Sequence, residues 1–175
     1  AAGRMPSVDL PAKLAGIVAD LASEVRSLAR SLVPLHMAHQ TLQAALRENA
    51  DVLQRLFRVA AALDFELDEH RIPGDAAPHL YRLAQEAARN AVRHGNAKTV
   101  RIAVRSLTAD TGELVVENDG SPFARSPVRR AGLGLSIMEQ RARMIGGTLV
   151  IQAGAAQGTR VSCRFPLEPS GANPR

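Results

Sequence analysis

The chain has 175 residues, of which 46% are hydrophobic and only 3% aromatic, so any core must be built from Leu, Ile, Val and Ala. This length suits one compact domain with an appended helical element. A single cysteine, Cys163, excludes an internal disulfide and fits a reducing compartment. The net charge of +5 comes from dispersed arginines without interleaved aromatics, a pattern of solvated helix faces that does not favour nucleic-acid binding.

Nothing in the sequence predicts contact with a membrane. The chain contains no run of about 18 apolar residues, the length that a membrane-spanning helix needs. The first ten residues lack the charged, apolar and small-residue sections of a signal peptide. We therefore expect a cytoplasmic location, which is also compatible with a membrane anchor elsewhere in a longer intact protein.

The first predicted element is a helix with a heptad seam. Its apolar positions step alternately by four and three residues, and they are Leu14, Val18, Leu21, Val25, Leu28 and Leu32. Such a seam favours packing against another helix in a bundle or dimer. The alternative is an amphipathic helix that lies on its own domain. Pro34 ends or kinks this helix.

Downstream, helical periodicity gives way to alternation with period two. The predicted elements in chain order are a helix over 41–57, a strand over 59–67, a helix that begins at or after Asp75, strands over 100–104 and 114–117, a helix over 136–145, and strands over 148–152 and 160–165. Residues 168–175 are predicted to be a disordered tail. Paired strands with helices on one side indicate a two-layer α/β sandwich with a mixed sheet, preceded by a long helix.

Three polar side chains stand four residues apart in the third helix. Glu86, Asn90 and His94 interrupt a run of Ala, Val and Arg in QEAARNAVRHG. At 3.6 residues per turn they share one side of the helix. Asn is a middling helix former that prefers caps and turns, so its position in mid-helix points to chemistry.

Glycines concentrate in three later stretches: NDGSPF (118–123), GLGL (132–135) and QGT (157–159). Each places Gly at a strand end or before a helix, where a backbone can approach a ligand closely. GLGL ahead of a helix leaves free N–H groups at the positive end of the helix dipole, which suits phosphate. Taken alone, GLGL would fit an ordinary loop-to-helix junction equally well, and NDG is a common turn.

The order of these stretches after the Glu/Asn/His helix resembles the nucleotide-binding domain of the GHKL superfamily, and in particular bacterial histidine kinases that pair with NarL/LuxR-type response regulators. HLYRLAQEAARNAVRHGNAKTVRI resembles the N box, LVVENDG the first glycine box, and GLGLSIMEQRARMIGGTLVIQAGAAQGTRVSCRFPL the second and third. EVRSLARSLVPLHMAHQTLQAAL resembles the second dimerisation helix and its connection. The resemblance spans roughly residues 14 to 167 and implies a Bergerat-type ATP-binding fold.

The resemblance implies a role for each matched position. Asn90 would coordinate Mg²⁺ that bridges the nucleotide phosphates, because an amide oxygen is a hard ligand for that ion. Glu86 would be the catalytic acid that orients water or assists proton transfer near the γ-phosphate. The residues implied in nucleotide binding are Asn90, His94, Asn118, Asp119, Gly120, Gly132, Leu133, Gly134, Leu135 and Thr159. Arginines 125, 129 and 130 would either meet phosphate or remain in solvent.

The first glycine box departs from the family pattern Asp-x-Gly-x-Gly at both ends. Asn118 stands where the family has the Asp that accepts from the adenine amino group, and Pro122 stands where it has Gly. A neutral acceptor makes a weaker hydrogen bond than a carboxylate. These departures keep open the alternative of a scaffold that binds no nucleotide.

These observations define the expected function. Residues 1–57 would belong to a dimerisation region and residues 58–167 to a catalytic ATP-binding domain. In the family that the sequence resembles, the phospho-accepting histidine is followed by Asp or Glu. Neither His36 nor His39 is followed by an acidic residue, so the phospho-accepting helix would be missing from this chain. The protein would transfer the γ-phosphoryl of Mg·ATP to a histidine and then to a NarL/LuxR-type response regulator, as a homodimer through the N-terminal helix. The alternative enzyme class is a GHKL serine protein kinase of the anti-sigma-factor type.

Overall fold

A computed structural model describes residues 40–122, 133–154 and 158–169. The described elements are α2 (Leu42–Phe57), β1 (Ala60–Glu66), the 3-10 helix η1 (Glu69–Arg71), α3 (Ala76–Arg93), β2 (Thr99–Ser106), β3 (Thr111–Asn118), α4 (Leu133–Met144), β4 (Thr148–Ala153) and β5 (Thr159–Pro166). The predicted heptad helix, His36 and His39, Gly132, and the arginines 125, 129 and 130 lie outside the described residues.

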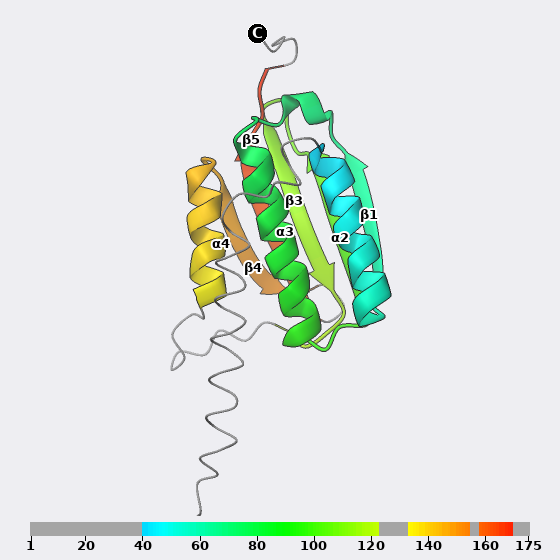
Figure 1. Ribbon diagram of the computed structural model, residues 1–175. Coiled ribbons are helices and arrows are strands. Elements are labelled where there is room, and N and C mark those ends of the chain that lie inside the picture. Colours follow the sequence, from blue (N-terminus) through cyan, green and yellow to red (C-terminus); the bar gives the residue numbers. More distant parts are fainter. Residues whose placement is uncertain (1–39, 123–132, 155–157, 170–175) are drawn as a thin grey trace, which may run out of the picture. The chain divides into compact units, whose positions relative to one another are not determined.

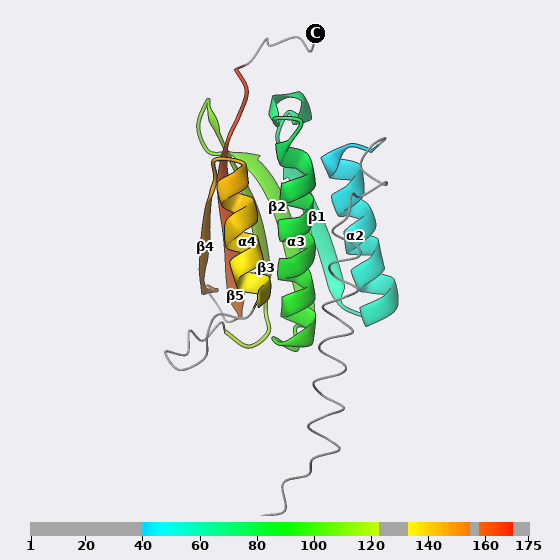
Figure 2. The same ribbon diagram turned by 60° about the vertical axis from the view of Figure 1, so that its left-hand side comes forward.

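The five strands form one mixed sheet in the order β1-β2-β3-β5-β4. β1 pairs with β2 in parallel, and every other neighbouring pair is antiparallel. Helices α2, α3 and α4 lie side by side on one face of this sheet, with α3 in the middle (Figures 1 and 2). The two-layer α/β sandwich with a mixed sheet and helices on one face is therefore confirmed.

Strand residues alternate between the two faces of the sheet, so one face supplies the core. The core side of β2 and β3 carries Ile102, Val104, Leu114 and Val116, each at most 2% exposed. α3 meets this layer with a row of alanines and leucines that includes Leu80, Leu83 and Ala84. Small residues on α3 allow its backbone to approach the sheet closely, and most of the helix's stability comes from this burial.

Two elements begin three residues earlier than the sequence predicts. β3 begins at Thr111 rather than Leu114, because Gly112 pairs in the sheet with Phe165 and leaves room for its ring. A Cβ on Gly112 would lie 2.6 Å from Cζ of Phe165, so this glycine serves close packing within the sheet. α4 begins at Leu133 rather than Ser136, which places part of GLGL in the first turn of the helix.

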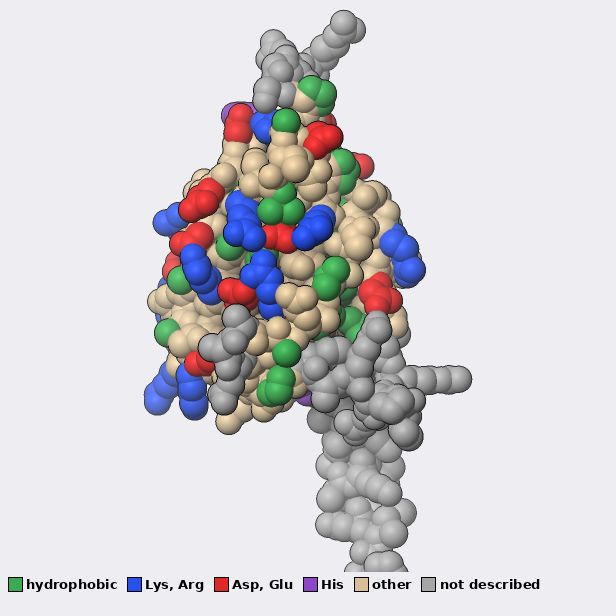
Figure 3. All heavy atoms as spheres, turned by 180° about the vertical axis from the view of Figure 1, so that it is seen from behind, with side chains coloured by type: hydrophobic (Ala, Val, Ile, Leu, Met, Phe, Trp, Pro, Cys, Tyr) green, Lys and Arg blue, Asp and Glu red, His purple; other side chains and the backbone are tan. Residues whose placement is uncertain are grey.

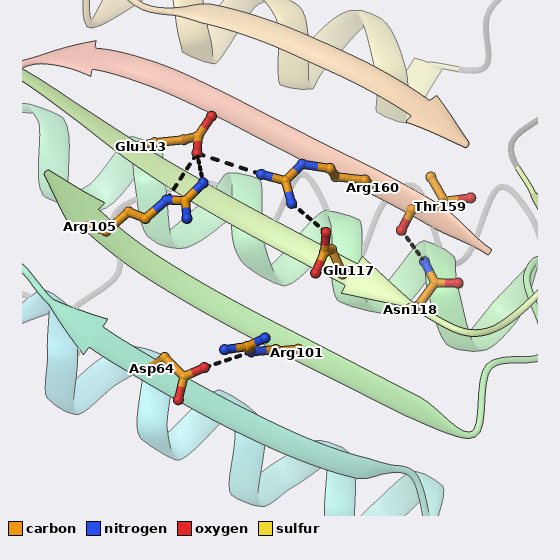
Figure 4. Close-up of polar contacts among 8 residues, drawn as sticks. All are labelled: Asp64, Arg101, Arg105, Glu113, Glu117, Asn118, Thr159 and Arg160. Atoms are coloured by element: carbon orange, nitrogen blue, oxygen red, sulfur yellow. Dashed lines mark hydrogen bonds and ion pairs between the residues drawn. The ribbon is translucent and has the colours of Figure 1, made fainter. Parts of the chain in front are cut away.

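The opposite face of the sheet carries a network of charged side chains (Figures 3 and 4). Glu113 on β3 is only 3% exposed and forms ion pairs with Arg105 at 2.7 Å and with Arg160 and Arg164 at 3.6 Å. Arg160 also pairs with Glu117. The arginine stems cover the buried carboxylate, so this face is closed by its own charged side chains.

The carboxyl-terminal part of the chain is fastened at the far end of the sheet. The backbone N–H of Glu168 donates to the Arg71 carbonyl at 2.8 Å, and Nε of Arg71 donates to the Glu168 carbonyl at 3.1 Å. Ordered structure therefore reaches Glu168, the first residue of the predicted tail. None of the helices in the described part of the chain is long and apolar enough to cross a membrane.

Candidate nucleotide site

The Glu/Asn/His row lies on α3, at the side of the helix that is not buried against the sheet. Glu86 and Asn90 are partly exposed, whereas the neighbouring Ala87, Ala88 and Ala91 are buried. His94 follows the last turn as the exposed C-cap, and its N–H donates to the Asn90 carbonyl at 2.9 Å. The predicted helix is confirmed, and the first two polar side chains share its α4 side.

Glu86 is held between its own helix and the first turn of α4. One terminal nitrogen of Arg89 lies 2.8 Å from Oε2 and 3.1 Å from Oε1 of Glu86. On the other side, a Cβ on Gly134 would lie 2.6 Å from Oε1. The carboxylate therefore rests against the amino end of α4, where the dipole of the helix favours negative charge.

α3 and α4 run antiparallel, as the α4 neighbours of two α3 residues, His79 and Glu86, show. His79, near the start of α3, has a pKa lowered by burial and by the charge of Arg141 near the end of α4. Glu86, further along α3, instead meets Gly134 at the beginning of α4. The amino end of α4 and the carboxyl half of α3 thus lie together, which brings GLGL to the Glu/Asn/His row.

Asn118 ends β3 at the same end of the molecule, and its amide group is tied on both sides. Oδ1 accepts from the N–H of Gly120 at 3.0 Å, and Nδ2 donates to the carbonyl of Thr159 at 3.2 Å (Figure 4). The hydroxyl of Thr159 in turn donates to the Ser121 carbonyl at 3.3 Å. Asn118 and Thr159, which the sequence places at one end of the site, are thus in direct contact.

Asp119 holds the loop after β3 to the beginning of β2. Its Oδ1 accepts from the backbone N–H groups of Lys98 at 2.8 Å and Thr99 at 2.9 Å. These hydrogen bonds, Thr99 first, lower the pKa of the Asp119 carboxyl. One of its two oxygens is thereby engaged within the protein.

Two glycines let loop backbones approach closely here. A Cβ on Gly120 would lie 2.2 Å from the Gly95 carbonyl oxygen, which accepts from the Ser121 N–H at 2.7 Å. Gly158 has a positive φ of 82°, and its Cβ would lie 1.9 Å from the Asn118 carbonyl oxygen. Gly is therefore required at both positions.

The structure brings most of the implied site residues to one end of the sandwich. Glu86, Asn90 and His94 come from α3, Asn118 to Gly120 from the end of β3, Gly134 and Leu135 from the first turn of α4, and Thr159 from the beginning of β5. Leu133 is the first residue of α4. Gly132 lies outside the described residues.

Sequence reasoning missed Arg89, the partner of Glu86. The three-residue spacing between them on a helix could have indicated the pair, because side chains at i and i+3 are neighbours. It also missed the backbone amides of Lys98 and Thr99, which no local pattern connects to Asp119.

A groove of about 860 Å³ borders the candidate site at Asn118. It is lined by the end of α2, the beginnings of β1 and β2 and the end of β3, including Gln54, Ala62, Arg101 and Asn118. Arg101 pairs in the sheet with Ala62 on one side and with Glu117 on the other, and these residues lie on the open face. The groove therefore does not hold the Glu86 and Asn90 side of α3.

The sequence matches the family described as histidine kinase-, DNA gyrase B-, and HSP90-like ATPase over residues 75–169, more than half of the chain. This chain belongs to that ATPase family. The matched range contains every described residue of the candidate site, from Glu86 to Thr159.

Curated relatives are sensor proteins. The chain is 30% identical to the sensor histidine kinase LiaS of Bacillus subtilis over 92% of this chain and 45% of LiaS. It is 32% identical to the nitrate/nitrite sensor protein NarQ of Escherichia coli over 75% of this chain and 23% of NarQ. The chain thus spans less than half the length of these relatives.

Solved structures confirm the fold. The ATP binding domain of PrrB from Mycobacterium tuberculosis matches with a TM-score of 0.59 and 23% identity, over 75% of this chain and 96% of that domain. The blue-light activated histidine kinase EL346 of Erythrobacter litoralis matches with a TM-score of 0.64 and 22% identity, over 87% of this chain and 59% of that protein.

Proposed function

We propose that this domain binds Mg·ATP at the end of the sandwich where α3, α4, β3 and β5 meet, and that in the intact protein it transfers the γ-phosphoryl group to a histidine. The observation that carries the proposal is the contact between Glu86 and Gly134. An acid of α3 lies against the amino end of α4. This contact supports the proposal, because the acid would orient a water or hydroxyl and the helix end would hold phosphate.

The residues present fit a magnesium nucleotide. Within the described ranges, no three His, Cys, Asp or Glu side chains gather closely enough to hold a metal ion by themselves. Mg²⁺ is commonly held by one or two protein oxygens together with substrate phosphates and water. Asn90, one turn after Glu86 and on the same side of α3, would supply such an oxygen, and the ion would neutralise phosphate charge.

The base end of the proposed site is formed by Asn118 and Thr159. Asn118 uses one acceptor position on Gly120 and one N–H on Thr159, so one acceptor and one donor position remain on its amide. That is enough for contact with the adenine edge. The engaged oxygen of Asp119 supports the loop, and Gly120 allows the backbone to approach the base.

Signalling partners follow from the relatives. Because LiaS and NarQ are named as sensor proteins, we propose that the intact protein passes the phosphoryl group to a response regulator of the NarL/LuxR type. We further propose that it acts in the cytoplasm and dimerises through the predicted heptad helix.

A nucleotide titration tests the proposal directly. Calorimetry with a nonhydrolysable ATP analogue is expected to show binding that weakens when EDTA removes Mg²⁺. Asn90→Ala should lower affinity at least about tenfold in the presence of Mg²⁺, as expected for loss of about 1.4 kcal/mol of binding free energy, and should leave the residual Mg-free affinity unchanged.

The matched control is Asn49→Ala on α2, which removes an amide far from the proposed site and should not alter nucleotide affinity. Absence of binding at millimolar nucleotide would favour the scaffold alternative. Full Mg-dependent affinity in Asn90→Ala would remove this residue from the metal site.

A further inference from the structure

We propose that Arg89 is a positioning residue that fixes the orientation of the Glu86 carboxylate at the amino end of α4. This inference rests on the proposed function, because it assigns Arg89 a part in the same phosphoryl transfer. Arg89 lies within the stretch that resembles the N box, but the resemblance implies no role for it. Its contacts with Glu86 in the structure are what indicate a role.

Arg89 closes one side of the carboxylate. A single terminal nitrogen reaches both oxygens, at 2.8 Å and 3.1 Å, so rotation of the carboxylate about its last bond would lengthen one of the two contacts. The Glu86 side chain is 17% exposed, whereas that of Arg89 is 36% exposed. This pair is therefore more shielded from solvent than an ordinary ion pair on a helix surface.

Gly134 closes the other side. Its missing side chain leaves the space that Oε1 occupies, since a Cβ there would lie 2.6 Å from this oxygen. Glu86 is thus confined between a guanidinium on its own helix and the backbone of another helix. A flexible side chain is in this way restricted to one position relative to the first turn of α4.

A second feature of Arg89 argues against a purely stabilising pair. Its Nε is buried and finds no hydrogen-bond partner among the residues that the structure describes. A buried donor without a partner destabilises a fold, so stability alone does not account for placing the guanidinium here. Catalytic groups, in contrast, must be held to within about 0.5 Å by their neighbours.

The chain offers a matched comparison in Arg55 and Asp51 on α2. This intrahelical pair is 3.6 Å apart, with side chains 75% and 49% exposed, and lies on a helix that contributes no residue to the proposed site. Removing Arg55 deletes the same kind of cation from a helix surface. It therefore separates loss of charge in general from loss of the Glu86 contact.

The test uses the full-length protein and measures its autophosphorylation by labelled Mg·ATP, with kcat and KM determined separately. Arg89→Ala is expected to lower kcat about 10- to 100-fold, as for other misplaced catalytic groups, and to change KM less than about twofold. Arg89→Lys should restore part of the lost rate, because a point charge can still contact one carboxylate oxygen. Arg55→Ala should match the wild type.

A double-mutant cycle ties the effect to Glu86. In a Glu86→Gln background, Arg89→Ala should lower kcat no further, since the group that Arg89 positions is already lost. Gly134→Ala displaces the carboxylate from the opposite side and should lower kcat in the wild type while adding little to Glu86→Gln.

Three results would overturn the inference: a kcat within about twofold of wild type in Arg89→Ala, equal effects of Arg89→Ala in the two backgrounds, or a lower melting temperature that accounts for the whole loss. Failure of the proposed function looks different. In that case the wild type itself binds no magnesium nucleotide, and the inference falls with it.

Discussion

Glu86 and Glu113 are two largely buried carboxylates in the same domain, and their surroundings differ. Glu113 lies among arginines from both neighbouring strands, with a side chain only 4% exposed (Figure 4). Glu86 has one arginine from its own helix and a glycine across from it. The first carboxylate joins strands and is saturated by cations. The second has a single cation as partner and lies against the amino end of a helix, where the helix dipole favours negative charge.

The largest expected difference between them is in catalysis. Glu86→Gln keeps the shape of the side chain and removes its ability to accept a proton. It should lower the autophosphorylation rate of the full-length protein about 100- to 10,000-fold, the usual contribution of a general acid or base. Glu113→Gln should leave the rate within about twofold at a temperature where both proteins are folded. Equal losses of autophosphorylation rate in the two variants would show that Glu86 has no catalytic role distinct from that of Glu113.

Close backbone contacts at the site should be the next most sensitive feature. Gly158→Ala forces a side chain into a positive φ and against the Asn118 carbonyl, and it should cost about 3 kcal/mol or more of unfolding free energy. Gly74→Ala is the control, because no atom lies within 4 Å of a Cβ placed there. Urea unfolding of both variants measures the difference. Similar midpoints would show that the loop before β5 adapts without strain.

Removal of the Glu113 carboxylate tests how much the charged network on the open face of the sheet contributes to stability. Glu113→Ala leaves three arginines without their shared partner, and the free energy of unfolding should fall by about 2–3 kcal/mol, less than for a fully buried pair because the arginines are partly exposed. Nucleotide affinity should remain within about twofold. The two quantities are measured by urea unfolding and by calorimetry. Weaker nucleotide binding would mean that the charged network on the open face is energetically coupled to the nucleotide site.

The smallest expected effect is the pH dependence of Asp119. Because hydrogen bonds from Thr99 and Lys98 lower its pKa in the folded state, its contribution to stability is present above the unfolded value of about 3.9 and is lost as pH falls through the folded pKa. The melting temperature of wild type should therefore exceed that of Asp119→Asn near neutral pH, and the difference should shrink below about pH 4. A difference independent of pH would exclude the ionised carboxylate as its source.

The sequence predicts the parts of this molecule that depend on local periodicity. Alternation in Val100, Ile102 and Val104 correctly predicts a strand, and the four-residue spacing of Glu86 and Asn90 correctly places both on one side of a helix. The order of the glycine stretches indicates the family. These features can be predicted because the spacing of side chains on one face of a helix or strand follows from the local backbone geometry.

The features that the sequence does not predict depend on contacts between residues that are distant in the sequence. Nothing near Gly112 reveals that a phenylalanine ring from β5 will cover it, so the early start of β3 cannot be predicted from the local sequence. The hydrogen bond from Asn118 to the Thr159 carbonyl joins residues 41 positions apart. The order of strands in the sheet, which creates both contacts, is not encoded in any single stretch.

The amide of Asn118 does more than stand in for the acid of the family pattern. Its Nδ2 donates to a backbone carbonyl, which a carboxylate cannot do, so Asp at this position would turn an oxygen towards the oxygen of Thr159. Asn118→Asp would thus remove a hydrogen bond between β3 and β5 and bring two acceptors together. The residue of the family pattern is therefore not interchangeable with Asn118 in this chain unless β5 also changes.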